Sequence, residues 1–399
     1  MTASLRIRRR NSTRLAVLSI AAAAALPLAA CGSESDAGPS GQNGAQAPEA
    51  TLTEPVATTY DGGILVLDGK TLDVVEDIPL AGFNRLNPAG DDRHVLVSTS
   101  TGFRVLDAGA PALTELEFAA AKPGHVVRHA GKTVLFADGT GEITVFDPDS
   151  LGSELPPTEV HRTPEAHHGV AVELDGGQLV TTLGNEDERP GIVVLDEDGN
   201  EIARNEDCPG VHGEATAAGE AVVIGCETGV LIYKNGKITK VSSPDEYGRI
   251  GNQAGSESSP ITLGDYKTDK DAELERPTRI SLINTETGTL DLVDIGTSYT
   301  FRSLGRGPGG EALVLGTDGH IHVIDPVRAT VTKTIPVIGE WQEPLEWQEA
   351  RPALFVRGAT AYVTDPDNNE ISAVDLDEGT KTTTAKLPAA PNEISGPLA

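Results

Sequence analysis

Basic residues are scarce in this chain. The 399 residues include 31 lysines and arginines against 60 aspartates and glutamates, which gives a formal net charge of −29. A surface this acidic repels the phosphate backbone, so nucleic acid is excluded as a partner. We attribute the acidity to solubility rather than to the steering of cations.

Compact metal motifs and helical periodicity are also missing. The chain has three cysteines, no Cys-x-x-Cys pair and no His-Glu-x-x-His sequence. A metal site would therefore have to be assembled from residues that are far apart in the sequence. No amphipathic helical period runs for any length after residue 55, whereas short runs of valine, isoleucine and leucine recur between glycine, aspartate and asparagine. This pattern predicts an all-β protein.

Residues 1–30 have the pattern of a secretion signal. Five arginines up to Arg14 precede an apolar stretch that is too short to span a bilayer comfortably. The stretch ends in Leu-Ala-Ala-Cys-Gly, which has the form of a bacterial lipobox. We expect cleavage before Cys31 and lipid on its sulfur; the alternative is a plain signal peptide followed by an incidental cysteine. Cleavage would remove five arginines and no acid, which moves the formal charge from −29 to −34.

Residues 31–55 carry almost nothing apolar and predict a flexible tether after the lipidated Cys31. The folded domain is then expected over residues 56–399. The lipid would hold this domain at the outer face of the cell membrane, in an extracytoplasmic compartment such as the periplasm. We expect the domain to be a monomer.

One short phrase recurs through the folded part. It consists of apolar residues that end in aspartate or a substitute, and its copies are about 44 residues apart, the length of a four-stranded propeller blade. Eight copies predict a single eight-bladed β-propeller. In the alternative, a seven-bladed ring, the first copy completes the last blade. The copies are ILVLD (64–68), FRVLD (103–107), ITVFD (143–147), IVVLD (192–196), VLIYK (230–234), ISLIN (280–284), IHVID (321–325) and ISAVD (371–375).

Turn chemistry agrees with the repeat. Asp-Gly turns join apolar runs at DGTG (138–141) and TDGH (317–320), which are hairpin signals. The aspartate that ends each phrase is expected to form a turn with the backbone that follows it. The first copy has no clear innermost strand before Pro55, so the C-terminal segment PNEISGPLA (391–399) is the candidate to supply that strand and close the ring.

Three histidines occupy the same place in three successive copies. His125, His168 and His212 each lie at the entry to the segment expected to form the innermost strand. Equivalent positions of neighbouring blades lie side by side around one axis, so the three imidazoles are expected to converge. Three nitrogen ligands plus a carboxylate make an ordinary tetrahedral zinc set.

Other candidate ligands are expected on the same face. His167 is adjacent to His168, and Glu214 and Asp187 are candidates for the fourth ligand. A carboxylate at this place could instead orient an imidazole from outside the ligand set. The alternative is that all these histidines are ordinary surface or channel residues. His94 and His161 have no partner that the sequence reveals.

Cys208 and Cys226 remain after Cys31 is assigned to the lipobox. In an oxidising compartment such a pair predicts a disulfide, with a thiolate metal site as the alternative. The strands near the two residues are expected to run antiparallel, so both sulfurs come to the same end of the blade. A bond between them would stiffen the loop that carries His212.

Two of these segments, AHHGVAV (166–172) and CPGVHGEA (208–215), and less sharply PGHVV (123–127), resemble the periplasmic zinc metallochaperones of the AztD type. The resemblance implies a propeller that binds zinc and passes it to the solute-binding protein of an ABC zinc importer. It implies zinc ligation by His168 and His212, then by His125, with His167 a weaker match. Members of that family also carry a mobile histidine-rich segment, which the tether of this chain lacks.

Two other functions remain open. A propeller lactonase would place calcium ligands at the channel mouth, where this chain is expected to place histidine. A quinone-dependent dehydrogenase would need a tryptophan motif in each blade, and the chain has two tryptophans in all. The second alternative is a metal-free surface scaffold that binds a protein partner. We predict a zinc-binding protein that is not an enzyme, since no general base is recognisable beside an open metal position.

Overall fold

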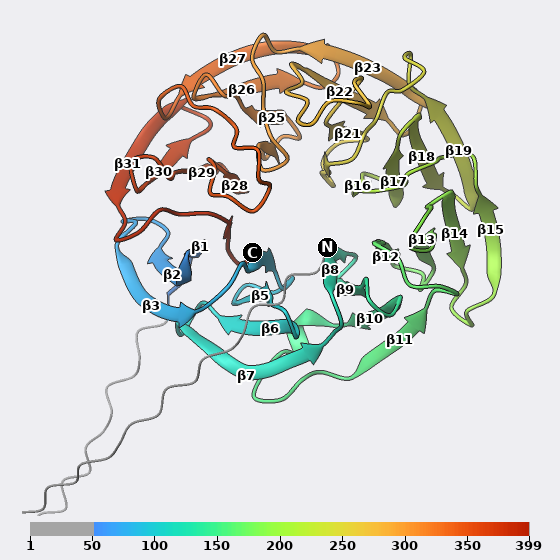
Figure 1. Ribbon diagram of the computed structural model, residues 1–399, viewed down its shortest axis with the longest axis horizontal. Helices are drawn as coiled ribbons and strands as arrows, with labels where there is room; N and C mark the ends of the chain where they lie inside the picture. Colours follow the sequence, from blue (N-terminus) through green and yellow to red (C-terminus); the bar gives the residue numbers. More distant parts are fainter. Residues whose placement is uncertain (1–51, 399) are drawn as a thin grey trace, which may run out of the picture. The chain divides into compact units, whose positions relative to one another are not determined.

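The computed structural model describes residues 52–398. These residues form eight four-stranded sheets arranged in a ring (Figure 1). The predicted eight-bladed β-propeller is therefore confirmed, and the seven-bladed alternative is wrong. The signal segment, Cys31 and most of the predicted tether lie outside the described residues.

In each sheet the strands are antiparallel neighbours, and all but the first sheet use four consecutive strands. Written from the innermost strand outward, the first four sheets are β32 (Ile394–Ser395), β1 (Pro55–Tyr60), β2 (Gly62–Asp68) and β3 (Val74–Leu80); β4 (Arg85–Pro88), β5 (His94–Ser98), β6 (Gly102–Asp107) and β7 (Ala112–Ala119); β8 (Pro123–His129), β9 (Lys132–Ala137), β10 (Glu142–Phe146) and β11 (Thr158–Arg162); and β12 (Ala171–Glu173), β13 (Leu179–Leu183), β14 (Gly191–Leu195) and β15 (Glu201–Asn205).

The other four sheets are β16 (Glu214–Ala217), β17 (Ala221–Cys226), β18 (Gly229–Lys234) and β19 (Lys237–Ser242); β20 (Gln253–Ala254), β21 (Ile261–Gly264), β22 (Arg279–Asn284) and β23 (Thr289–Asp294); β24 (Leu304–Arg306), β25 (Ala312–Leu315), β26 (His320–Asp325) and β27 (Thr330–Pro336); and β28 (Leu354–Arg357), β29 (Thr360–Asp365), β30 (Glu370–Asp375) and β31 (Thr380–Lys386). A short 3-10 helix, Pro148–Ser150, follows β10. None of the helical segments within residues 52–398 has the length and hydropathy that a membrane crossing requires.

The ring closes with a strand from the C-terminus. Ile394 and Ser395 of β32 pair with Thr58 and Ala57 of β1, so the first blade is built from both ends of the described chain. The Thr58 hydroxyl also donates a hydrogen bond of 2.8 Å to the carbonyl oxygen of Glu393. The C-terminal segment therefore supplies the missing innermost strand, as predicted.

The recurring phrase forms the third strand of every blade, and its terminal aspartate makes a turn. The Asp68 carboxylate accepts hydrogen bonds of 2.9 Å from the backbone N–H groups of Lys70 and Thr71. Asp325 and Asp375 accept equivalent bonds from the residues that follow them. The structural role predicted for these aspartates is confirmed.

Apolar side chains fill the spaces between the blades. The two middle strands of a blade, such as β5 and β6, are largely buried, whereas outermost strands such as β3 are largely exposed. One continuous apolar cluster joins the three blades that begin with β8, β12 and β16. These are the blades on which the three equivalent histidines lie, so the histidines share one packed platform.

Candidate metal centre

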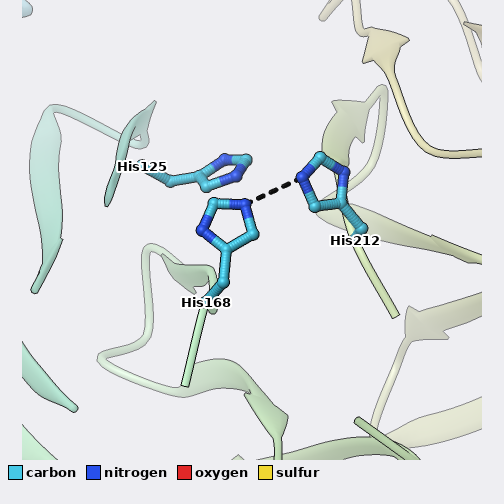
Figure 2. A group of neighbouring side chains, drawn as sticks. All are labelled: His125, His168 and His212. Atoms are coloured by element: carbon cyan, nitrogen blue, oxygen red, sulfur yellow. Dashed lines mark hydrogen bonds between the residues drawn. The ribbon is translucent and has the colours of Figure 1, made fainter. Parts of the chain in front are cut away.

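Three histidines from three neighbouring blades meet in one cluster beside the innermost strands (Figure 2). His125 lies in β8, His168 in the loop before β12 and His212 in the loop before β16. The ring centroid of His125 is 5.2 Å from that of His168 and 5.3 Å from that of His212. The centroids of His168 and His212 are 4.9 Å apart. The structure thus brings together the three histidines that share a register in the repeat.

A glycine beside each histidine lets the backbone approach its neighbours closely. At Gly124, a Cβ would lie 2.1 Å from Oδ1 of Asp138. Gly213 has a φ of +71°, and a Cβ there would lie 2.4 Å from the carbonyl oxygen of Gly251. A Cβ at Gly213 would strain the backbone and clash with it, and a Cβ at Gly124 would displace the Asp138 carboxylate, so the Gly-His and His-Gly pairs are part of how the site is built.

The Nδ1 atom of each imidazole is held by an acceptor outside the cluster. Nδ1 of His168 lies 2.5 Å from Oδ2 of Asp138, and Nδ1 of His125 lies 3.0 Å from Oε2 of Glu214. Nδ1 of His212 lies 2.5 Å from the carbonyl oxygen of Gly251. An acceptor at Nδ1 fixes the proton there and leaves Nε2 as a lone pair, which is the tautomer that binds a metal through Nε2.

The Nε2 atoms face into the cluster. Nε2 of His168 lies 2.9 Å from Nε2 of His212, the contact that Figure 2 marks with a dashed line. When both Nδ1 atoms carry protons, two lone pairs point at each other across this distance, and a cation between them relieves the repulsion. Tetrahedral zinc at about 2.0–2.1 Å from each nitrogen needs a slightly wider separation, so a small outward movement of the rings would accommodate it.

The electrostatic surroundings differ among the three rings. Burial lowers the pKa of His125, but the charge and hydrogen bond of Glu214 outweigh burial, so the pKa of His125 is raised. Burial, followed by the charges of His125 and His168, holds the pKa of His212 well below its ordinary value. His212 is therefore neutral, and able to bind a metal, at neutral pH.

A cavity of about 610 Å³ opens beside the three rings. Its lining combines the histidines with the cations Arg85, Arg249 and Lys267 and with the carboxylates Asp138, Glu214 and Asp265. The side chain of His168 is 43% exposed, whereas that of His125 is mostly covered. The cluster is thus reachable from solvent on the side of His168.

The structure places the other candidate ligands in different roles. Glu214 contacts His125 Nδ1 from outside the ring of Nε2 atoms. His167 is buried, and its two ring nitrogens lie 3.0 Å from the Glu165 carbonyl oxygen and from the Thr182 hydroxyl, so the structure does not bring it into the cluster. Asp187 lies on the loop between β13 and β14, where it lines a neighbouring pocket rather than the histidine cavity.

Three groups at the site were not singled out from the sequence. Asp138 belongs to the DGTG hairpin. Its place in a turn already explained this aspartate, so the sequence did not indicate its contact with His168. Gly251 contributes only a backbone carbonyl oxygen, which no residue pattern marks. Asp265 accepts hydrogen bonds from the backbone N–H groups of Gly251 (2.6 Å) and Asn252 (3.0 Å), and so fixes the segment that holds His212. Burial raises the pKa of Asp265.

Cys208 and Cys226 form a disulfide, with their Cα atoms 5.6 Å apart. The bond ties the loop before β16, which carries His212, to the end of β17. The amino group of Lys240 lies 3.0 Å and 3.2 Å from the two sulfurs, and burial lowers its pKa to about 8. The predicted disulfide is present, and the alternative of a thiolate metal site is not adopted.

The fold and the cluster define an eight-bladed β-propeller that presents three imidazoles beside its innermost strands. The chain is similar to the zinc chaperone AztD of Citrobacter koseri, with 27% identity over 300 residues, which cover 72% of this chain and 69% of that protein. This likeness confirms the resemblance to AztD-type zinc chaperones that the histidine segments indicate.

Solved structures show the same architecture. Two crystal structures of Citrobacter koseri AztD, one of them of the apo protein, each match with a TM-score of 0.74 and 23% identity, over 86% of this chain and 96% of theirs. The dihydro-heme d1 dehydrogenase NirN matches with a TM-score of 0.57 and 12% identity, over 86% of this chain and 75% of its own. The likeness to NirN concerns the fold alone. No family model matches the chain.

Proposed function

We propose that this chain is an extracytoplasmic zinc metallochaperone that binds Zn²⁺ with His125, His168 and His212. In this proposal it delivers the ion to the solute-binding protein of an ABC zinc importer. The observation that carries the proposal is the arrangement of the three rings, whose Nδ1 atoms are held from outside while nitrogens converge within 4.8 Å. The similarity to the zinc chaperone AztD supports zinc as the metal.

The donor set fits a cargo ion that is both held and released. Three imidazole nitrogens are good zinc ligands, and a fourth position remains for water or for a group of the receiving protein. The partly exposed His168 gives a partner access to the ion from one side. Ligand exchange through this open position would allow transfer without loss of zinc to solvent.

We propose binding and transfer rather than hydrolysis. The two carboxylates nearest the rings, Asp138 and Glu214, are engaged with His168 and His125. A carboxylate that holds a ligand in place is not available as a general base for an attacking water. Lipid on Cys31 and the tether of residues 31–55 would keep the propeller at the membrane, close to an importer.

Metal content is the first test. The full chain, exported and processed by the cell, is compared with the His125→Ala/His168→Ala/His212→Ala variant by elemental analysis after exposure to Zn²⁺ and gel filtration. We expect the variant to lose about one zinc per chain relative to the parent, because three ligands are removed. His320→Ala, which removes a half-exposed histidine on a different blade, is the matched control and should retain the parent's content. Equal zinc in parent and triple variant would refute the site.

Transfer is tested with a chelator present. Zinc-loaded protein is mixed with the zinc-free solute-binding protein of the host's zinc importer, in an excess of EDTA that captures free Zn²⁺. Zinc that reaches the receiver under these conditions must pass within a complex. If the receiver stays empty, as it does with zinc chloride and EDTA alone, the delivery role is wrong even when the zinc site is real.

A further inference from the structure

Two cations line the cavity beside the three histidines without an ion pair of their own. Arg249 lies between β19 and β20, Lys267 lies between β21 and β22, and both residues are half-buried. Within residues 52–398 no carboxylate oxygen comes within 4.0 Å of a side-chain nitrogen of either residue. In a chain with 60 acidic and 31 basic residues, most cations have carboxylates to choose from, so two unpaired cations in one cavity call for a physical explanation.

The backbone places these two cations directly opposite each other. Arg249 and Lys267 form an antiparallel bridge, in which the Arg249 N–H donates a hydrogen bond of 2.8 Å to the Lys267 carbonyl oxygen and the Lys267 N–H donates one of 2.9 Å to the Arg249 carbonyl oxygen. The side chains of such a pair leave the same face of the ladder, with Cβ atoms about 4.5–5.5 Å apart, and like charges there are destabilising. An anion bound by both side chains would remove this repulsion.

The carboxylates around the cavity are already engaged. Asp265 accepts hydrogen bonds from two backbone N–H groups, and Glu275, in the loop that follows Lys267, does the same. Asp138 and Glu214 hold imidazole nitrogens. The protein therefore supplies binding groups for an anion at this place and leaves the position of the anion open.

The guanidinium of Arg249 also lies against the segment that holds His212. A Cβ at Gly251 would be 2.3 Å from Nη1 of Arg249, and the carbonyl oxygen of the same glycine contacts Nδ1 of His212. An anion bound to Arg249 would therefore lie close to the three-histidine cluster. There it would offset part of the charge that a bound zinc ion adds to a cavity with two cations in its wall.

We propose that Arg249 and Lys267 bind a carboxylate group in this cavity. A guanidinium can donate two parallel hydrogen bonds to the two oxygens of a carboxylate, and the ammonium group of a lysine can donate another. The cavity of about 610 Å³ admits a small organic acid or an acidic side chain of the receiving protein. The carboxylate site uses none of the three histidines, and only its connection to zinc delivery rests on the proposed function.

Succinate is the probe for a free carboxylate. The zinc-free triple-histidine variant is titrated with succinate by calorimetry at low ionic strength, so that neither zinc nor the three imidazoles can bind the probe. We expect one saturable site per chain. Adding Arg249→Gln or Lys267→Gln should weaken binding at least about tenfold, because each removes charge-assisted hydrogen bonds. Lys237→Gln, which neutralises an exposed lysine on β19, is the matched control and should leave succinate binding unchanged.

The source of the carboxylate is determined with the receiving solute-binding protein. If the occupant is an acidic side chain of the receiver, Arg249→Gln should weaken the complex with the zinc-loaded chain at least about tenfold, and succinate should compete with the receiver. If it is a free organic acid, succinate should bind while Arg249→Gln leaves the complex unaltered. The proposal is overturned if neither succinate nor the receiver distinguishes Arg249→Gln from Lys237→Gln. A receiver that does not bind the parent refutes delivery, and the succinate titration then decides the carboxylate site alone.

Thermal melting separates a ligand site from a structural role. Repulsion between the two cations opposes folding, so Lys267→Gln should not lower the melting temperature of the anion-free protein. Succinate should raise the melting temperature of the parent, because it binds the folded chain, and should have no such effect on the Arg249→Gln/Lys267→Gln variant. A lower melting temperature for Lys267→Gln with unaltered succinate binding would overturn the role assigned to Lys267.

Discussion

Two sides of the ring use the same position of the blade for different chemistry. Before β12 and β16 the chain places His168 and His212, whereas before β24, β28 and β32 it places Arg302, Arg351 and Glu393. On the arginine side the charges cancel within the protein, through an Arg302–Glu393 contact of 2.7 Å and an Arg351–Glu343 contact of 2.8 Å. On the histidine side the outward nitrogens have partners and the inward nitrogens face one another.

The difference shows that the position before an innermost strand can hold either a charged pair that stabilises the fold or a histidine that can bind a metal. Burial lowers the pKa of Arg302 to about 10, and the neighbouring Glu393 opposes that shift. The opposite charges of this pair offset each other without a bound ion. On the histidine side, the Nε2 atoms of His168 and His212 face each other with no opposite charge between them, and a bound cation would fill that place. Stability and metal binding should therefore respond to changes on opposite sides of the ring.

Glu393→Ala should give the largest loss of stability. The substitution leaves the buried guanidinium of Arg302 without its carboxylate, which costs about 3–5 kcal/mol for a pair of this kind. Denaturant unfolding monitored by circular dichroism measures the change. At denaturant concentrations below its unfolding transition, the Glu393→Ala variant should bind as much zinc per chain as the parent. A loss of zinc without a loss of stability would contradict the division between the two sides.

Removal of the disulfide should have the next largest effect. Cys208→Ser/Cys226→Ser opens a link between residues 18 apart and should cost about 3 kcal/mol of unfolding free energy. Because the link holds the loop that carries His212, zinc affinity should also decline. Unfolding experiments with and without zinc measure both changes. Unaltered zinc affinity would show that packing alone holds that loop.

Asp138→Asn should weaken zinc binding with little change in stability. The carboxylate orients His168, and loss of such a partner costs about 10–100-fold in metal affinity. Competition titration against a chromogenic chelator measures the change. The control is Asp318→Asn, which removes the carboxylate partner of His322 on another blade and should leave zinc affinity unaltered.

Acid should release zinc first through His125. The pKa of His125 is raised, so this ring gains a proton at a higher pH than an ordinary histidine, and a protonated imidazole cannot bind zinc. Affinity should therefore decline as the pH falls toward that raised pKa, while His212 resists protonation. Glu214→Gln removes the charge that raises the pKa of His125 and should move the decline to lower pH. A shift toward higher pH would reverse the role assigned to Glu214.

The repeat made the blade count and the three histidines predictable, because a regular period converts sequence register into spatial register. It could not reveal Gly251, whose contribution is a backbone carbonyl oxygen, or the second role of Asp138. No partner for His94 or His161 is predictable from the sequence, and the structure places Asp91 beside the first and Glu159 with Glu173 near the second. Contacts between the outermost strand of one blade and the innermost strand of the next, such as those near His161, depend on the reach of side chains, which a repeat period does not encode.

The position of β32 in the chain also constrains the order in which the ring can be completed during synthesis. Thr58 and the Glu393 carbonyl oxygen are 335 residues apart in the chain, and their contact can form only after Glu393 has been synthesised. The blades that carry the histidines are complete much earlier, at residue 242. A chain interrupted before Ile394 would lack β32, so the first blade would have no innermost strand and β1 would be left as an unpaired edge.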